Sequence, residues 1–225
     1  MLNIVLYNCS AKKLRMHQFV DFLKKRLKSD LPGGEAHQRM MAQRIGGDFR
    51  MNHTRPPRKG AVMIALYEED GKVFFPLTQR PDYDGVHGGQ VSLPGGKMEE
   101  EDVDLETTAI RETFEEIGIQ IERQNVIGAL SDLNITASNF IVKPVISFLA
   151  EKPEFRRDPR EVAQIFTAEI NHLSDARTLK ETELTVGPNI RLRAPYFDIE
   201  EKVVWGATSM ILSEFVSLIN EYKNG

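Results

Sequence analysis

Three closely spaced glutamates, Glu112, Glu115 and Glu116, are the residues of this sequence whose type and spacing best suit a functional site. In a helix with 100° between successive residues, the other two lie within about 60° of Glu112, so all three carboxylates share one face. Carboxylates this close repel one another by a few kcal/mol at an effective dielectric constant of about 20. A divalent cation such as Mg²⁺ would relieve that repulsion, because hard cations bind oxygen ligands. A solvated acidic face with Arg111 as an ion-pair partner is the alternative interpretation.

The residues around the glutamates form a longer pattern. Positions 111–119 read R-E-T-F-E-E-I-G-I, and the pair Gly95-Gly96 precedes them, where backbone groups can approach a ligand closely. The pattern resembles the signature of the Nudix hydrolases, G-x5-E-x7-R-E-U-x-E-E-x-G-U, in which U is an aliphatic residue. Val103 stands where the strict spacing has the first glutamate, and Thr113 occupies a U position.

A second resemblance points to one branch of that family, the coenzyme A pyrophosphatases. Gly96 and Arg111 lie one residue further apart than in the general pattern, and Asp102 stands six residues after Gly96, as in that branch. Residues 77–96, LTQRPDYDGVHGGQVSLPGG, are similar to its second motif. The departures from this motif are Pro81 in place of a serine, Leu93 in place of an aromatic residue, and the lack of an arginine at 85 or 86.

The resemblance implies a metal-dependent pyrophosphohydrolase. Its substrate would be coenzyme A or acyl-CoA, split into 3′,5′-ADP and (acyl-)4′-phosphopantetheine. ADP-ribose, a dinucleotide such as NADH or a nucleoside triphosphate is the alternative substrate, and nucleotide binding without turnover is the alternative function. Cations between the acids and a diphosphate would offset both negative charges and activate a water. The expected ligands of one to three Mg²⁺ or Mn²⁺ ions are Gly96, Glu112, Glu115 and Glu116.

Further residues have expected roles in this site. Arg111 would pair with the glutamates and hold their rotamers. The general base would be a signature glutamate or Glu161, for which an exposed helix position without a catalytic role is the alternative. Asp102 precedes a helical run and is expected to cap it, as aspartate often does. The expected substrate contacts are Arg80, whose guanidinium suits phosphate oxygens, His87 and Gly95. The alternatives are an exposed arginine at a strand end for Arg80 and a structural loop histidine for His87.

The elements that must position these residues are readable from periodicity. Residues 105–117 have helical spacing, and Ile110, Thr113, Phe114 and Ile117 form the stripe expected to face the core. An α/β (α+β) fold follows, with a mixed sheet flanked by helices, and the family resemblance implies an α/β/α sandwich. The other expected elements are a hairpin over 61–80 turning at Asp70-Gly71, strands at 125–133 and 141–150, a helical middle in 159–173, a hairpin over 196–206 and a helix over 207–222.

The chain divides into two parts. Residues 1–55 are expected to form an N-terminal helical arm, with an amphipathic helix at 17–28 and a second helical piece at 35–45. Residues 56–225 are expected to form the hydrolase domain. The arm would pack on this domain or on a partner chain. Trp205 is expected in the core or at a dimer contact, which would allow a homodimer, and a platform for an adenine ring is the alternative.

Composition excludes several classes of protein. The net charge of −4, from 29 basic and 33 acidic residues, provides no general attraction for nucleic acid or an anionic membrane. No apolar stretch approaches the roughly 20 residues that span a bilayer. The first residues lack the basic leader of a signal peptide, and the single Cys9 allows no internal disulfide. These features favour a cytoplasmic protein that acts on a small molecule.

Overall fold

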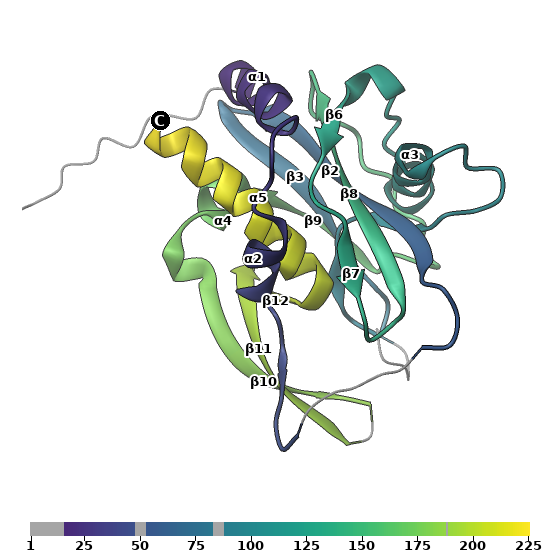
Figure 1. The fold of residues 1–225 in the computed structure, drawn as a ribbon. Helices are drawn as coiled ribbons and strands as arrows, with labels where there is room; N and C mark the ends of the chain where they lie inside the picture. The colour runs from purple at the N-terminus through teal and green to yellow at the C-terminus, as the bar shows by residue number, and fades with distance from the viewer. Residues whose placement is uncertain (1–15, 48–52, 83–87, 188) are drawn as a thin grey trace, which may run out of the picture.

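The computed structural model describes residues 16–47, 53–82, 88–187 and 189–225 (Figure 1). Its helices are α1 (Met16–Arg26), α2 (Gly33–Gln38), α3 (Leu105–Ile117), α4 (Ile170–Leu173) and α5 (Gly206–Asn224), with short 3₁₀ turns at Arg123–Asn125 and Ala176–Thr178. Its strands are β1 (Gln43–Arg44), β2 (Arg58–Glu69), β3 (Lys72–Gln79), β4 (Val91–Ser92), β5 (Gly95–Lys97), β6 (Val126–Ala129), β7 (Leu133–Ile135), β8 (Phe140–Leu149), β9 (Gln164–Glu169), β10 (Leu179–Val186), β11 (Ile190–Ile199) and β12 (Lys202–Trp205).

The larger of the two sheets is mixed and has eight strands. Its main path is β4-β3-β2-β8-β6, while β5 pairs with β2, β7 with β8 and β9 with β3. The central strands β2 and β8 run parallel, and the other pairs are antiparallel. Strand β2 is buried almost continuously from Gly60 to Tyr67, as expected for a strand covered on both faces.

Helices cover both faces of this sheet, as Figure 1 shows. On one face, α3 packs over Ala61, Met63 and Val145. On the other face, α1 and α5 enclose a larger apolar core that includes Ile64 and Phe75. Residues that alternate along β2 thus enter two different cores, because successive side chains of a strand point to opposite faces. The predicted mixed sheet between helical layers is confirmed.

A second, smaller sheet flanks α5 and is drawn below it in Figure 1. Strands β10 and β11 form a long antiparallel hairpin, with β12 and the short β1 pairing with β11. This hairpin over residues 179–199 was not among the predicted elements. Its first strand carries mostly exposed polar side chains, so it lacks the apolar alternation that identifies a strand in sequence.

Several local predictions are confirmed. The first hairpin turns at Asp70 and Gly71, which have φ values of 50° and 72°, the backbone of a two-residue turn that matches strand twist. The helix over 105–117, the hairpin over 196–206 and the closing helix are all present as expected. No helix of the described residues is both long enough and apolar enough to cross a membrane.

Two predictions are wrong. The middle of 159–173 is strand β9, not a helix, and only the four residues of α4 after it are helical. Pairing with β3 completes this edge of the sheet and overrides the helical pattern of the segment. The second helical piece of the arm ends at Gln38, and Gln43–Arg44 pair with β11 as a strand instead.

The described part of the arm, residues 16–47, packs on the main domain. Phe19 of α1 is fully buried, and its ring lies 6.2 Å from that of Phe215 and 5.2 Å from that of Tyr222, both in α5. Helix α2 is held by a buried carboxylate of α5, Glu214. The Gly33 amide donates to it at 3.1 Å, and the His37 ring nitrogen lies 3.1 Å away. The arm is therefore part of the core that covers the sheet.

Glu214 also joins the loop between β6 and β7 to the arm. The Ser131 hydroxyl donates to Glu214 at 2.7 Å, and the Ser131 amide donates to the same carboxylate. Burial alone would raise the pKa of Glu214, but the hydrogen bonds from His37, Ser131 and Gly33 together lower it. The charged Glu214 carboxylate thus holds together α2, α5 and the loop between β6 and β7, which lie far apart in the sequence.

Candidate active site

Strand β5 brings the glycine pair against the acidic residues of α3. The Gly95 amide donates a hydrogen bond to a carboxylate oxygen of Glu116 at 3.2 Å. A Cβ on Gly96 would lie 2.4 Å from Glu112 Oε1, and one on Gly95 would lie 2.3 Å from the carbonyl oxygen of Ala61. Neither space admits a side chain, so both positions require glycine for this close approach.

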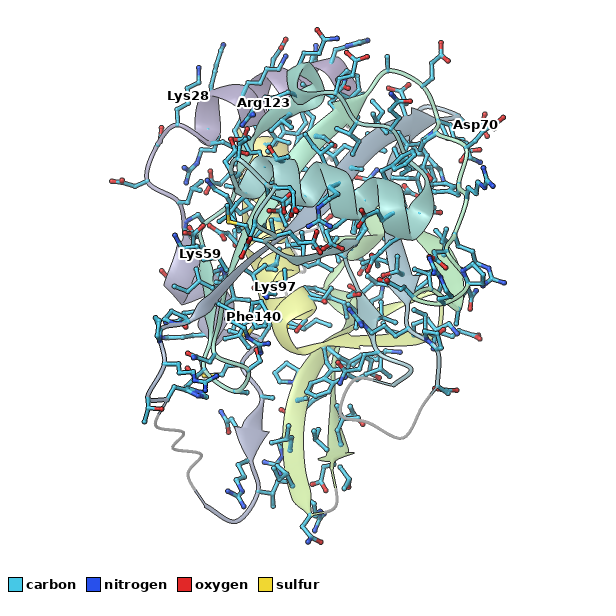
Figure 2. The ribbon with its side chains drawn as sticks, turned by 90° about the vertical axis from the view of Figure 1, so that its right-hand side faces the viewer. Lys28, Lys59, Asp70, Lys97, Arg123 and Phe140 are labelled. Carbon is cyan, nitrogen blue, oxygen red and sulfur yellow. The ribbon has the colours of Figure 1, made fainter. Side chains whose placement is uncertain are left out.

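Helix α3 has a capping group at each end, which fixes where the helix begins and ends. Asp104 is its N-cap and accepts from the Thr107 amide at 2.9 Å. The helix ends at Gly118, whose amide donates to the Phe114 carbonyl at 2.9 Å. Figure 2 looks onto this helix, with Arg123 near its N-terminal end and Lys97 of β5 below it. The capping role predicted for Asp102 belongs to Asp104.

Two of the three glutamates of α3 are shielded from solvent, whereas the Glu115 side chain is 54% exposed. Glu116 is only 4% exposed, and the Glu112 side chain is 13% exposed. Phe114 is 57% exposed, so the predicted core stripe is wrong at this residue, although Thr113 and Ile117 are buried as expected. Helical periodicity separates the faces of a helix, but the glycine pair beneath α3 determines which face is covered.

Burial makes the charged forms of two glutamates unfavourable. It raises the pKa of Glu116 to about 8, against the opposing effects of the Gly95 amide and the Arg80 charge. Burial also raises the pKa of Glu112, against the opposing charge of Arg111. The charge of Glu161 contributes to both increases, which places that residue near the cluster. The site therefore concentrates carboxylates that a cation would stabilise.

Arg111 is the centre of a hydrogen-bond network that joins the glutamates of α3 to the loop before the helix. Its Nε and Nη2 donate to the two Asp102 oxygens at 3.0 and 2.9 Å. Its Nη1 donates to Glu112 at 3.1 Å and to Glu115 at 2.9 Å. Its Nη2 also donates to the Lys97 carbonyl at 3.1 Å. The guanidinium thus holds the two glutamates and the loop in fixed relative positions.

Asp102 anchors Arg111. Its side chain is 2% exposed and also accepts from the Glu99 amide at 3.0 Å and the Thr108 hydroxyl at 2.9 Å. The Arg111 guanidinium is the main cause of a pKa for Asp102 of about 2. Sequence reasoning missed this role, because Asp102 and Arg111 are nine residues apart, in a loop and a helix, and no helical or strand spacing relates them.

The loop after β8 brings Glu161 to the cluster. The Asp158 amide donates to the Glu116 carbonyl at 2.9 Å, and the Arg156 amide donates to the Ile117 carbonyl at 2.8 Å. These bonds satisfy carbonyl groups that the last turn of α3 leaves without helical partners. Glu161 itself is exposed and lies in a turn rather than a helix.

Arg80 follows directly after β3. Its amide donates to the Gln90 carbonyl at 3.0 Å, and its charge opposes the rise in the Glu116 pKa. Arg80 therefore lies close enough to Glu116 for its charge to act on that carboxylate. The predicted substrate contact His87 lies outside the described residues.

The donor chemistry of the cluster suits a hard cation. Carboxylate oxygens from Glu112, Glu115 and Glu116 and the carbonyl oxygen of Gly96 are the ligand types that Mg²⁺ and Mn²⁺ prefer. Among the described residues, however, no three acidic, histidine or cysteine side chains stand close enough together to form a ready metal site. Arg111 binds two of the three glutamates in this arrangement, so a cation would compete with the guanidinium for their oxygens.

Comparison with known proteins identifies the family. The NUDIX domain model matches residues 57–193. Nudix hydrolase 15, mitochondrial, of Arabidopsis thaliana is 35% identical over 173 residues, which are 73% of this chain and 60% of that protein. Uncharacterized Nudix hydrolase NudL of Yersinia enterocolitica is 32% identical over 147 residues, which are 64% of this chain and 73% of that protein.

A solved structure shares the fold. A MutT/nudix family protein from Enterococcus faecalis aligns with a TM-score of 0.52 at 13% identity, over 93% of this chain and 76% of that chain. The matched region includes the loop, β5 and α3, which together form the acidic cluster. The chain belongs to the NUDIX domain family.

Proposed function

We propose that this protein hydrolyses the diphosphate of coenzyme A or acyl-CoA, with Mg²⁺ or Mn²⁺, to 3′,5′-ADP and (acyl-)4′-phosphopantetheine. The observation that carries the hydrolase part is the burial of Glu112 and Glu116 against Gly95-Gly96, which raises the pKa of both carboxyl groups. The similarity of residues 77–96 to the second motif of the coenzyme A pyrophosphatases supports the choice of substrate.

The residues of this chain divide the work in the proposed reaction. Glu112, Glu115, Glu116 and the Gly96 carbonyl would hold the cation, which when bound neutralises phosphate charge and lowers the pKa of a water. Arg111 holds Glu112 and Glu115 in position, and the Gly95 amide holds Glu116. Arg80, whose charge acts on Glu116, would bind phosphate oxygens.

The reaction balances with water as the only co-reactant. Water oxygen forms a bond to one phosphorus, and the bond from that phosphorus to the bridging oxygen breaks. The bridging oxygen leaves with the other phosphate, and the proton of the attacking water passes to a carboxylate. Glu161 or a glutamate of α3 would take this proton, since a positioned carboxylate can act as a general base.

A substrate panel tests the proposal. The purified protein is incubated with Mg²⁺ or Mn²⁺ and with coenzyme A, acetyl-CoA, ADP-ribose, NADH or a nucleoside triphosphate, and the products are separated by chromatography. We expect 3′,5′-ADP from coenzyme A at a higher kcat/KM than for any other compound. Faster cleavage of ADP-ribose or NADH would refute the substrate and keep the hydrolase. No cleavage in the panel, with nucleotide binding retained, would indicate a non-catalytic family member.

A further inference from the structure

A cavity of about 340 Å³ lies between the smaller sheet and the segment that leads to the glycine pair. One wall consists of Gln79 at the end of β3 and residues 88–91. The opposite wall consists of residues 184–187 at the tip of β10 and residues of β12. The volume lies near the lower end of the range of about 300–1,000 Å³ that is usual for small-molecule pockets.

The wall formed by the smaller sheet contains four apolar residues, including the only tryptophan of the chain, beside the polar Thr185, Glu201 and Lys202. Val203 and Trp205 of β12 line the cavity, whereas Val204 between them is buried in the core, as strand alternation requires. Leu184 and Val186 of β10 line the same cavity. Val203 is 39% exposed, so part of the apolar surface of this wall is not covered by other side chains. Trp205 is half-buried and lies outside both core clusters, contrary to the expected core position.

The cavity and the candidate active site are connected through the end of β3. Gln79 lines it, and the next residue, Arg80, acts electrostatically on Glu116. The Gln79 side chain donates to the Gly89 carbonyl at 3.2 Å, which joins the two parts of this wall. Val91 also lines the cavity and stands four residues before Gly95, so the two Cα atoms are at most about 14 Å apart. An extended nucleoside diphosphate has a comparable length.

The charges at the rim favour an uncharged ring over a phosphate. Lys202 and Glu201 both line the cavity, so their opposite charges offset each other there. An indole face and branched aliphatic side chains provide a surface for a planar heteroaromatic ring. The Gln79 amide and the backbone of residues 88–91 provide polar groups for the edge of such a ring.

We propose that this cavity binds the heteroaromatic base of the nucleotide half of the substrate, with Trp205 as the stacking surface. The proposal rests on the proposed function, because it assumes a substrate with a nucleotide half whose diphosphate lies at the acidic cluster. Val203 and Leu184 would then act on substrate affinity, while the residues of α3 act on turnover.

Intrinsic fluorescence tests this subsite directly, since Trp205 is the only tryptophan. The wild-type protein is titrated with 3′,5′-ADP and with AMP, and separately with 4′-phosphopantetheine, which carries a phosphate but no base. We expect saturable quenching by both nucleotides and none by 4′-phosphopantetheine. The absence of quenching by either nucleotide at millimolar concentration would overturn the proposal.

A pair of variants links the cavity to catalysis. Val203→Glu places a charge on the apolar wall and is expected to weaken 3′,5′-ADP binding and raise KM at least tenfold, with kcat changed less than twofold. Leu179→Glu is the matched control, because Leu179 is an apolar residue of the same sheet, is 51% exposed and lies outside the cavity lining. It should leave both quantities unchanged. Equal effects of the two variants would overturn the proposal.

The remaining outcomes separate this proposal from its alternatives. If light scattering shows that Val203→Glu dissociates a dimer while 3′,5′-ADP binding is unchanged, the apolar wall is a subunit interface and the subsite is refuted. If nucleotides quench Trp205 but no compound of the panel is hydrolysed, the base subsite stands and the proposed function fails. If coenzyme A is hydrolysed but no nucleotide quenches Trp205, the proposed function stands and the base subsite fails.

Discussion

Replacing Asp102 by asparagine should destabilise the protein by about 2 kcal/mol at neutral pH. Asp102 is almost fully buried and accepts two hydrogen bonds from the Arg111 guanidinium. This pairing is the main reason why its pKa falls from 3.8 to about 2. Because one pKa unit corresponds to about 1.4 kcal/mol, the charged form contributes about 2 kcal/mol to the free energy of unfolding. Asparagine keeps the shape of the side chain and removes this contribution.

Asp104→Asn is the matched control. Asp104 stands in the same loop, and its carboxylate caps α3. Asparagine caps a helix as well as aspartate does, so this exchange should change the free energy of unfolding by less than about 0.5 kcal/mol. Its side chain is 42% exposed, and solvent therefore screens its ion pair with Arg123. The two exchanges alter the same chemical group, which differs between the two positions in its burial and in what it binds.

The assay is urea unfolding followed by circular dichroism, between pH 7 and pH 3. A carboxyl group whose pKa is lowered by folding stabilises the protein above its unfolded pKa, near 4, and loses this effect as the pH falls toward 2. The difference between wild type and Asp102→Asn should therefore shrink by about half at pH 3. Equal stability of the two variants, or a difference that does not change with pH, would refute the anchoring role of Asp102.

Glu116→Gln should lower the turnover of the preferred substrate of the panel at least about 100-fold, as removal of a charged catalytic group commonly does. In the absence of metal, the Glu116→Gln protein should be no less stable than wild type in thermal melts at pH 7, because burial already favours the neutral form of the Glu116 carboxyl group. Glu214→Gln should lower the free energy of unfolding by about 3 kcal/mol in urea titrations, since it disturbs a buried charge with several donors. The control Glu221→Gln, on the exposed side of the same helix, should cost less than about 1 kcal/mol. Gly96→Ala should reduce kcat at least about tenfold in the panel assay, because its Cβ would lie 2.4 Å from a glutamate oxygen. Gly34→Ala has no atom within 4 Å of the new Cβ and should leave kcat unchanged.

The parts of the fold that were predictable depend on interactions between residues close in sequence. The turn at Asp70-Gly71 follows from residues that tolerate positive φ, and α3 follows from its periodicity and from Gly118 at its end. The segment 159–173 shows the opposite case. Its pattern fits a helix, yet the edge of β3 supplies backbone partners for a strand, and those partners lie 85 to 95 residues earlier.

The amino-acid sequence by itself determined that Glu112, Glu115 and Glu116 share a helix and that a glycine pair stands before it, because helical spacing and close backbone approach are local properties. Tertiary structure decided which face of α3 is buried and that Asp102 anchors Arg111. It also placed Trp205 beside a cavity. Each of these depends on the path of a loop or on the packing of one sheet near another, and contacts between distant segments leave no periodic pattern along the chain.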